Sequence, residues 1–107
     1  MNKGIVYVNN EVAGKIIRNS DGYIFRYDDI YFNNPLKKAV SVTLPKTQQE
    51  YYSKVLFPFF FNMLSEGENK KLQCRVFRID ENDYFSLLLA IGAETIGAVT
   101  VKPEIIS

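Results

Sequence analysis

The chain has 107 residues, of which 47% are hydrophobic and 23% are charged. This composition predicts one globular domain spanning residues 1–107 and excludes an intrinsically disordered chain. The net charge of +1 excludes an affinity for nucleic acid that rests on overall charge, although it leaves room for a local basic patch.

The chain also lacks the usual marks of export and of membrane insertion. Cys74 is the only cysteine, so no internal disulfide can form, as expected in a reducing cytoplasm. The sequence shows no cationic start followed by an apolar signal core, and no apolar run approaches the roughly 18 residues of a membrane span. We therefore expect a cytoplasmic protein without membrane attachment.

The first third of the chain predicts an antiparallel meander. A β-branched strand over residues 5–8 ends at Asn9-Asn10, a pair that suits a tight hairpin turn. The return strand is expected over residues 12–18, and residues 19–22 (Asn-Ser-Asp-Gly) form a second turn signal. Aromatic residues then alternate with other side chains over residues 23–27, which indicates a strand with one buried face.

The middle of the chain is less regular in its pattern. Residues 28–34 are expected to form an irregular or single-turn segment. Apolar and polar residues alternate over residues 40–44, which predicts a strand that Pro45 terminates. Residues 46–53 are polar and are expected to form a mobile loop.

The second half predicts helices. Pro58 suits the first turn of a helix that continues to Leu64 and is closed by Gly67. A second helix is expected over residues 68–79, with its buried stripe formed by Leu72, Val76 and Ile79.

Asp80 is expected to cap the last helix, with Asp83 in the acidic position of a capping box. That helix continues to Ile91, Gly92 ends it, and residues 97–101 form a closing strand. The predicted class is α+β: a small, mainly antiparallel sheet, arranged as a meander, with about three helices packed on one side.

Residues for catalysis are scarce. The chain has no histidine, which excludes Ser-His-Asp and Cys-His catalysis and any metal site that needs histidine. It has neither a phosphate-binding glycine loop nor the catalytic motifs of a kinase. The carboxylates of two groups, Glu66 with Glu68 and Asp80 with its acidic neighbours, are better explained as turn charges and helix caps. We expect no enzyme activity, no cofactor and no metal, and Cys74 is expected to be a packing residue.

Two features have both a structural and a functional interpretation. Phenylalanines at 57, 59, 60 and 61 surround one short helix, so they either fill a core between sheet and helices or leave some rings exposed for a partner. A basic face on the next helix is either a solvated surface or a contact for an acidic partner, with DNA phosphates as the weaker alternative. This face consists of Lys70, Lys71, Arg75 and Arg78.

Several sequence blocks follow one another in an order that resembles a known family. They are residues 6–14 (Val-Tyr-Val-Asn-Asn-Glu-Val-Ala-Gly), 25–27 (Phe-Arg-Tyr), 41–45 (Ser-Val-Thr-Leu-Pro), 59–67 (Phe-Phe-Phe-Asn-Met-Leu-Ser-Glu-Gly), 83–88 (Asp-Tyr-Phe-Ser-Leu-Leu) and 97–99 (Gly-Ala-Val). Together they resemble the N-terminal subdomain 1 of HipA-type Ser/Thr kinases. The resemblance covers most of the chain.

The sequence departs from the family pattern at a few positions. Ser65 stands where the family usually has proline, and Ala93-Glu94 stands where it often has Gly-Asp. Glu68 occupies a position that is commonly aromatic in relatives that are made as separate proteins. If such a relative inserts this aromatic side chain into a kinase that it inhibits, the present chain is expected to inhibit its kinase in a different way.

The resemblance implies a function through a partner. Only residues 102–107 follow the matched region, where a HipA-type kinase would continue into its catalytic core, so we expect a free-standing accessory domain. Such domains are the HipS-like antitoxins of tripartite HipBST systems, which neutralise a separately encoded HipT-like Ser/Thr kinase toxin. A HipB-like helix-turn-helix protein is expected to supply DNA binding to the complex, and no direct nucleic acid binding is expected of this chain.

The residues expected to contact the kinase lie in one segment. They are Phe57, Phe60, Phe61, Ser65, Glu66, Gly67 and Glu68. An alternative role is a non-inhibitory assembly subunit that bridges the kinase and the HipB-like protein for promoter repression.

Overall fold

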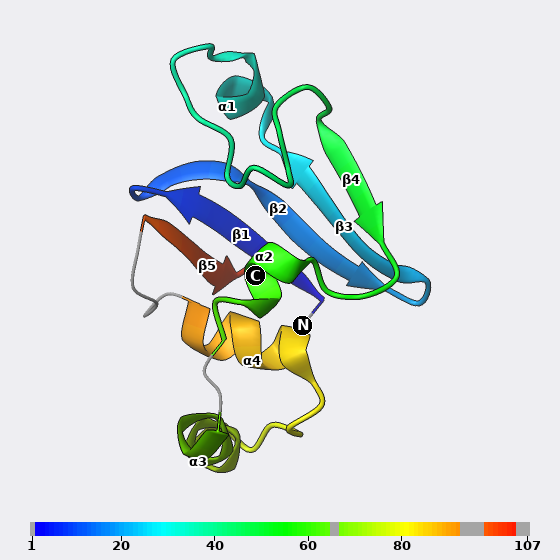
Figure 1. The fold of residues 1–107 in the computed structure, drawn as a ribbon, viewed down its shortest axis with the longest axis vertical. Coiled ribbons are helices and arrows are strands. Elements are labelled where there is room, and N and C mark those ends of the chain that lie inside the picture. Colours follow the sequence, from blue (N-terminus) through cyan, green and yellow to red (C-terminus); the bar gives the residue numbers. More distant parts are fainter. Residues whose placement is uncertain (1, 65–66, 93–97, 105–107) are drawn as a thin grey trace.

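The computed structural model describes residues 2–64, 67–92 and 98–104 (Figure 1). Its sheet has the strand order β4-β3-β2-β1-β5, and every neighbouring pair is antiparallel. The strands are β1 Lys3–Val8, β2 Glu11–Asn19, β3 Gly22–Tyr27, β4 Glu50–Ser53 and β5 Val99–Pro103. The helices are α1 Asp29–Asn33, α2 Pro58–Phe61, α3 Gly67–Phe77 and α4 Tyr84–Ile91. The predicted α+β class is confirmed.

The two hairpins of the meander form where the turn residues predicted them. Asn9 and Asn10 adopt φ angles of 51° and 68°, the left-handed conformation that a two-residue hairpin turn requires and asparagine tolerates. At the second turn the side-chain oxygen of Asn19 accepts hydrogen bonds from the backbone N–H groups of Asp21 and Gly22, both at 2.9 Å. The Asn19 bonds hold the turn from which β2 and β3 pair, with Asn19 opposite Gly22.

The strand predicted over residues 40–44 is wrong. Val40 and Leu44 are buried, but Val42 between them is 95% exposed, and the segment forms a turn. The reason is a tertiary contact: the Tyr27 hydroxyl accepts from the Val40 N–H at 2.9 Å and donates to the Leu44 carbonyl. The alternation of apolar residues therefore marks two anchor points around one tyrosine, and not a strand.

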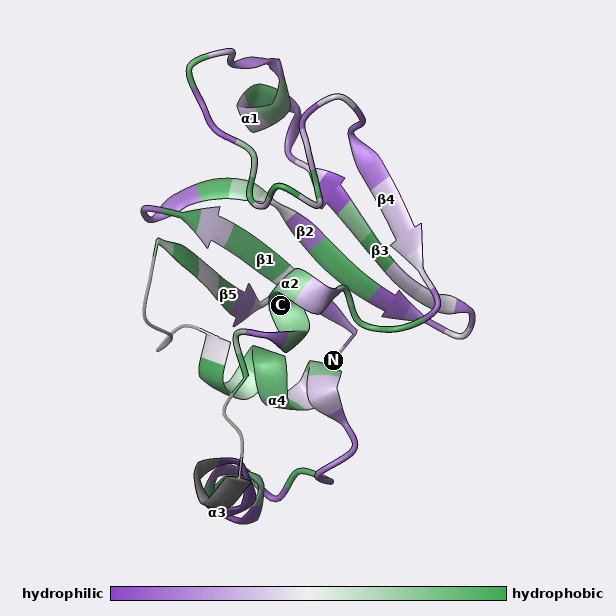
Figure 2. Ribbon diagram, in the orientation of Figure 1, coloured by the Kyte–Doolittle hydropathy of each residue, from purple (hydrophilic) through white to green (hydrophobic). Residues whose placement is uncertain are grey.

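The loop predicted over residues 46–53 is also wrong in its second half. Glu50–Ser53 forms β4, which pairs with β3 at the edge of the sheet. Figure 2 shows β4 as the most hydrophilic strand, and an edge strand can be polar because its outer side faces solvent. Gly22 of β3 allows β4 to approach closely, because a Cβ atom at this position would collide with the Ser53 carbonyl.

Helices α2 and α4 pack on the sheet and build the main core with it (Figure 1). Helix α3 packs on α4 and lies farther from the sheet. The fully buried members of the main core include Val6, Ile16, Phe25, Tyr27, Phe60, Phe85, Leu88 and Val101.

The face that α3 buries differs from the prediction. Cys74 is buried against Leu87 and Ile91 of α4, which confirms its packing role. Leu72 and Val76, predicted to form the buried stripe, are 57% and 65% exposed. The period of the apolar residues located a helix but could not say which of two candidate faces would meet α4.

The ends of α3 and α4 are set by specific backbone contacts. Helix α3 ends at Phe77 because Arg78 has a φ of 57° and the Ile79 N–H donates to the Cys74 carbonyl at 2.8 Å. This pattern is a Schellman motif.

Helix α4 ends with Gly92 as its C-cap, as predicted. The closing strand β5 begins at Val99 and continues to Pro103, while Gly97 of the predicted strand lies outside the described residues. Among the helices of the described ranges, none is long and apolar enough to cross a membrane.

Candidate protein-interaction surface

The segment expected to contact a partner begins at α2, a single turn that Pro58 starts at a position where its missing N–H costs nothing. Phe60 is completely buried and packs against Phe25 of β3, with 5.8 Å between ring centroids. Phe57, the residue before the helix, is 6% exposed. Both rings therefore belong to the core of the described chain, and their expected part in a partner contact stays a prediction.

Phe61 is the exposed phenylalanine of this helix, whereas Phe59 is partly buried against the core. The Phe61 side chain is 40% exposed, and its ring meets the ring of Tyr84, the first residue of α4, edge to face with 4.9 Å between centroids. The ammonium group of Lys70 in α3 lies over the Tyr84 ring, 4.6 Å from its centroid. Residues from α2, α3 and α4 thus meet at one point of the surface.

Beside this aromatic pair lies a hollow of about 430 Å³, which we call the Phe61 groove. Its walls are mostly apolar, and Val55 at its edge is 68% exposed. The residues that line it are Tyr23, Lys54, Val55, Leu56, Pro58, Phe61 and Tyr84. An apolar hollow with exposed aromatic and aliphatic walls suits an apolar side chain of a protein partner.

The remaining residues of the expected contact segment are placed only in part. Ser65 and Glu66 lie outside the described residues. Gly67 is the first residue of α3 and Glu68 the second. The prediction that Gly67 closes the preceding helix is therefore wrong: that helix ends at Phe61, and the glycine begins the next one.

Sequence reasoning missed the part of the groove that the loop before α2 provides. Lys54 and Val55 were expected only as chain between a polar loop and a helix. A signal was present, since residues 55–57 (Val-Leu-Phe) are three consecutive apolar residues before a helix start. A run of this kind cannot be buried completely by one helix turn, and here Leu56 and Phe57 are buried while Val55 is exposed.

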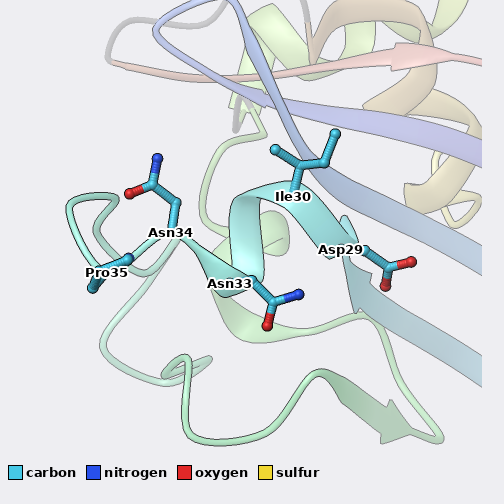
Figure 3. A pocket seen from close by; sticks show the side chains of 5 residues that line it. All are labelled: Asp29, Ile30, Asn33, Asn34 and Pro35. Atoms are coloured by element: carbon cyan, nitrogen blue, oxygen red, sulfur yellow. The ribbon is translucent and has the colours of Figure 1, made fainter.

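A second hollow, of about 530 Å³, lies around α1 and is less suited to a ligand (Figure 3). The side chains that line it point in different directions from the helix and do not converge on a common point. They are Asp29, Ile30, Asn33, Asn34 and Pro35. Convergent polar groups are the usual feature of a small-molecule site.

The acidic residues at the start of α4 have a structural role. Asp83 caps α4: its Oδ1 accepts from the Ser86 N–H at 3.1 Å and its Oδ2 accepts from the Ser86 hydroxyl at 2.7 Å. The predicted cap, Asp80, instead accepts from the Asn82 N–H at 2.8 Å in the preceding turn. Burial alone would raise the pKa of Asp83, but the hydrogen bonds from Ser86 and Arg18 outweigh it and hold the pKa below its usual value.

Within the parts of the chain that the structure describes, no three histidine, cysteine, aspartate or glutamate side chains come together in a way that could hold a metal ion. The sheet, its covering helices and the Phe61 groove instead define a small α+β domain with a surface suited to protein contacts.

Comparison with known proteins assigns this domain to a family. The family model of the HipA N-terminal domain matches residues 4–102, so the chain belongs to the HipA N-terminal domain family. The structure is similar to the solved structure described as the N-terminal domain of HipA toxin, with a TM-score of 0.75, 25% identity, and coverage of 100% of this chain and 96% of that one. The family is a non-catalytic domain of HipA.

Relatives carry this domain in two settings. An uncharacterized protein of Haemophilus influenzae is 34% identical over 101 residues, and the match covers 94% of this chain and 92% of that protein. The protein named "Putative kinase Y4mE" of Sinorhizobium fredii is 23% identical over 100 residues, which cover 92% of this chain but 24% of that protein. The chain therefore spans about a quarter of this kinase-named relative.

A further structural match has the same fold within an assembly. It is described as the Shewanella oneidensis MR-1 toxin–antitoxin system of HipA, HipB and its operator DNA. The TM-score is 0.75 at 18% identity, and the match covers 96% of this chain and 24% of that one.

Proposed function

We propose that this protein is a HipS-like antitoxin, a single domain over residues 1–107 without enzyme activity of its own. It binds a separately encoded HipT-like Ser/Thr kinase toxin in the cytoplasm and neutralises it. The observation that carries this proposal is the family match over residues 4–102. The Haemophilus influenzae relative, of which the match covers 92%, supports the idea that such a domain is made as a separate protein.

The match to Y4mE supports a kinase as the partner. In Y4mE the matched region is about a quarter of the chain, so this domain can pack against the rest of the same protein. A separate copy of the domain would offer the same kind of surface to a kinase that lacks it. The Phe61 groove is an exposed apolar surface of the described residues, and we assign it to this contact.

The proposed contact surface combines Phe61 and Val55 of the groove with the segment from Ser65 to Glu68. Inhibition requires that the antitoxin bind the inactive state of the kinase more tightly than the active state. It can do so by holding the kinase in an inactive arrangement or by placing residues 65–68 at the nucleotide cleft. In either case the kinase supplies the chemistry and this protein shifts its conformational equilibrium.

Co-expression with a HipT-like kinase from the same genome tests the proposal. We expect growth to be restored, the two proteins to purify together, and phosphorylation by the purified kinase to fall when this protein is added. A kinase variant without catalytic activity serves as the control for toxicity. Kinase activity that stays unchanged at saturating amounts of this protein would contradict the antitoxin role.

The complex with HipB and operator DNA in the Shewanella oneidensis match favours a second candidate function. In that case the protein is an assembly subunit that joins the kinase to a HipB-like helix-turn-helix protein. The HipB-like protein contacts the DNA, and the assembled complex represses the promoter. A complex of all three proteins that represses the promoter but leaves phosphorylation unchanged would favour this role.

A further inference from the structure

Helix α3 presents an outward face that the rest of the described protein does not cover. The helix is attached to α4 through Cys74, which packs with Leu87 and Ile91. On other sides of the helix, Leu72 and Val76 are 57% and 65% exposed. Two aliphatic side chains one turn apart form a continuous apolar strip on a helix.

A row of cations runs beside this strip. Lys71 and Arg75 precede Leu72 and Val76 by one residue each, so they lie along the same edge of the helix, and Arg78 follows at its end. All three are exposed, and none of them has an ion pair with another side chain that the structure describes. We call the whole set the α3 outer face; its members are Lys71, Leu72, Arg75, Val76 and Arg78.

Helix stability explains only part of this set. Cations near a helix C-terminus interact favourably with the helix dipole, which accounts for Arg75. It does not account for Lys71 in the middle of the helix, or for the exposed Leu72 and Val76. Arg78 is in the left-handed conformation, with a φ of 57°, where glycine is the residue that carries no steric cost.

We propose that the α3 outer face binds an acidic segment of the partner kinase that also carries apolar side chains; this inference rests on the proposed function. Charge complementarity selects an acidic partner for three cations that have no ion pair among the described side chains. The aliphatic strip beside them selects a protein over DNA, because phosphates gain nothing from contact with Leu72 and Val76. The contact is separate from the Phe61 groove, although Lys70 of the same helix reaches Tyr84 at the groove.

Affinity for the HipT-like kinase, measured with pairs of matched variants of the full chain, tests this proposal. Arg75→Glu is compared with Lys38→Glu, which reverses an exposed charge elsewhere on the surface. We expect Arg75→Glu to weaken binding at low salt by about tenfold and Lys38→Glu to leave it unchanged. The difference between the two should shrink at high salt, because ions screen the contact.

A second pair tests the apolar strip. Val76→Ser is compared with Val42→Ser, since Val42 is also exposed but lies in the loop before β4. We expect about a fivefold loss of affinity for the first variant and none for the second. Both sites are exposed, so neither change removes core packing.

The outcomes separate this inference from the proposed function. Wild-type binding with all four variants at wild-type affinity would overturn the α3 contact and leave the antitoxin role intact. No binding by the wild type would overturn both. A loss by Arg75→Glu of affinity for a DNA duplex, with kinase affinity kept, would assign the face to nucleic acid and overturn the inference.

Discussion

Arg18 of β2 donates a hydrogen bond from Nη1 to Oδ1 of Asp83, the cap of α4, over 2.8 Å. The Arg18 guanidinium also lies over the Phe85 ring, 5.0 Å from its centroid. Arg18 thus attaches β2 to the start of α4 through an ion pair with Asp83 and a cation–π contact with Phe85. Since Tyr84 lies between Asp83 and Phe85, this contact also fixes a wall of the Phe61 groove.

Replacement of Asp83 by alanine should destabilise the protein by about 1–2 kcal/mol, because it removes a helix cap and the acceptor for Arg18. The free energy of unfolding from chemical denaturation measures the effect. Asp80→Ala is the matched control, and it should cost less because Asp80 bonds only within its own turn. An equal loss for both variants would contradict the assignment of Asp83 as the residue that caps α4.

The pKa of Asp83 predicts how stability depends on pH. The pKa is lowered in the folded protein from an ordinary value of 3.8, so the unfolded chain binds the proton more readily. The stabilisation is therefore present above that ordinary value and is lost as the pH falls through the lower pKa of the folded state. We expect unfolding curves between about pH 5 and pH 3 to show a steeper loss for the wild type than for Asp83→Asn. Parallel pH profiles would contradict this assignment.

Tyr27→Phe should cost about 1–3 kcal/mol of stability, because the Val40 N–H and the Leu44 carbonyl would lose their buried partner. Thermal and chemical unfolding provide the measurement. Tyr52→Phe is the control: its hydroxyl donates to the Asp21 carbonyl at 2.6 Å but the side chain is exposed. We expect that change to stay within about 0.5 kcal/mol.

Arg78→Gly should make the protein more stable than Arg78→Ala by about 1 kcal/mol, because only glycine removes the steric cost of the left-handed conformation. Both variants lose the same charge, so their difference in unfolding free energy isolates the backbone effect. Both should also bind the kinase more weakly if the α3 outer face is the contact. A more stable Arg78→Gly variant with undiminished kinase affinity would support the backbone effect and contradict a role of Arg78 in the kinase contact.

Val55→Asp should weaken the kinase complex by about tenfold or more, since it places a charge at the edge of the Phe61 groove. The measurement is co-purification followed by titration of the purified proteins. Val42→Asp makes the same chemical change at an exposed site that does not line the groove, and it should bind like the wild type. Identical behaviour of the two aspartate variants would exclude the groove from the contact.

Local chemistry in the sequence was enough to predict the start of the fold. The Asn9-Asn10 turn and the Asn19 turn depend on residue types that favour their own backbone conformation, so β1, β2 and β3 were found close to their observed bounds. The stop at Gly92 was predicted too, but its reason is tertiary: Gly92 has a helical φ of −62°, and a Cβ atom there would lie 2.8 Å from the Val101 carbonyl oxygen of β5. The order of the family blocks also predicted the family that the comparison assigns.

The tertiary structure decided which side chains are available at the surface. Phe60 and Phe61 are neighbours of the same type, but one is completely buried against Phe25 and the other is at the groove. The contact segment was predicted as a unit, and the contact of all its residues with a partner remains a prediction. A single turn of helix points its residues in all directions, so the sequence alone cannot distinguish the buried ring from the exposed one.

The same physical reason explains the errors in the strands and in α3. The residues around Val40 alternate like a strand, yet the hydroxyl of Tyr27, far away in the sequence, holds them in a turn. Helix α3 has apolar residues on more than one side, and its packing on α4 selected Cys74 over Leu72. Turns and helix starts depend on neighbours along the chain, so the residue types there were sufficient to predict them. The choice of buried face depends on surfaces that folding brings together, so it could be read only from the packed structure.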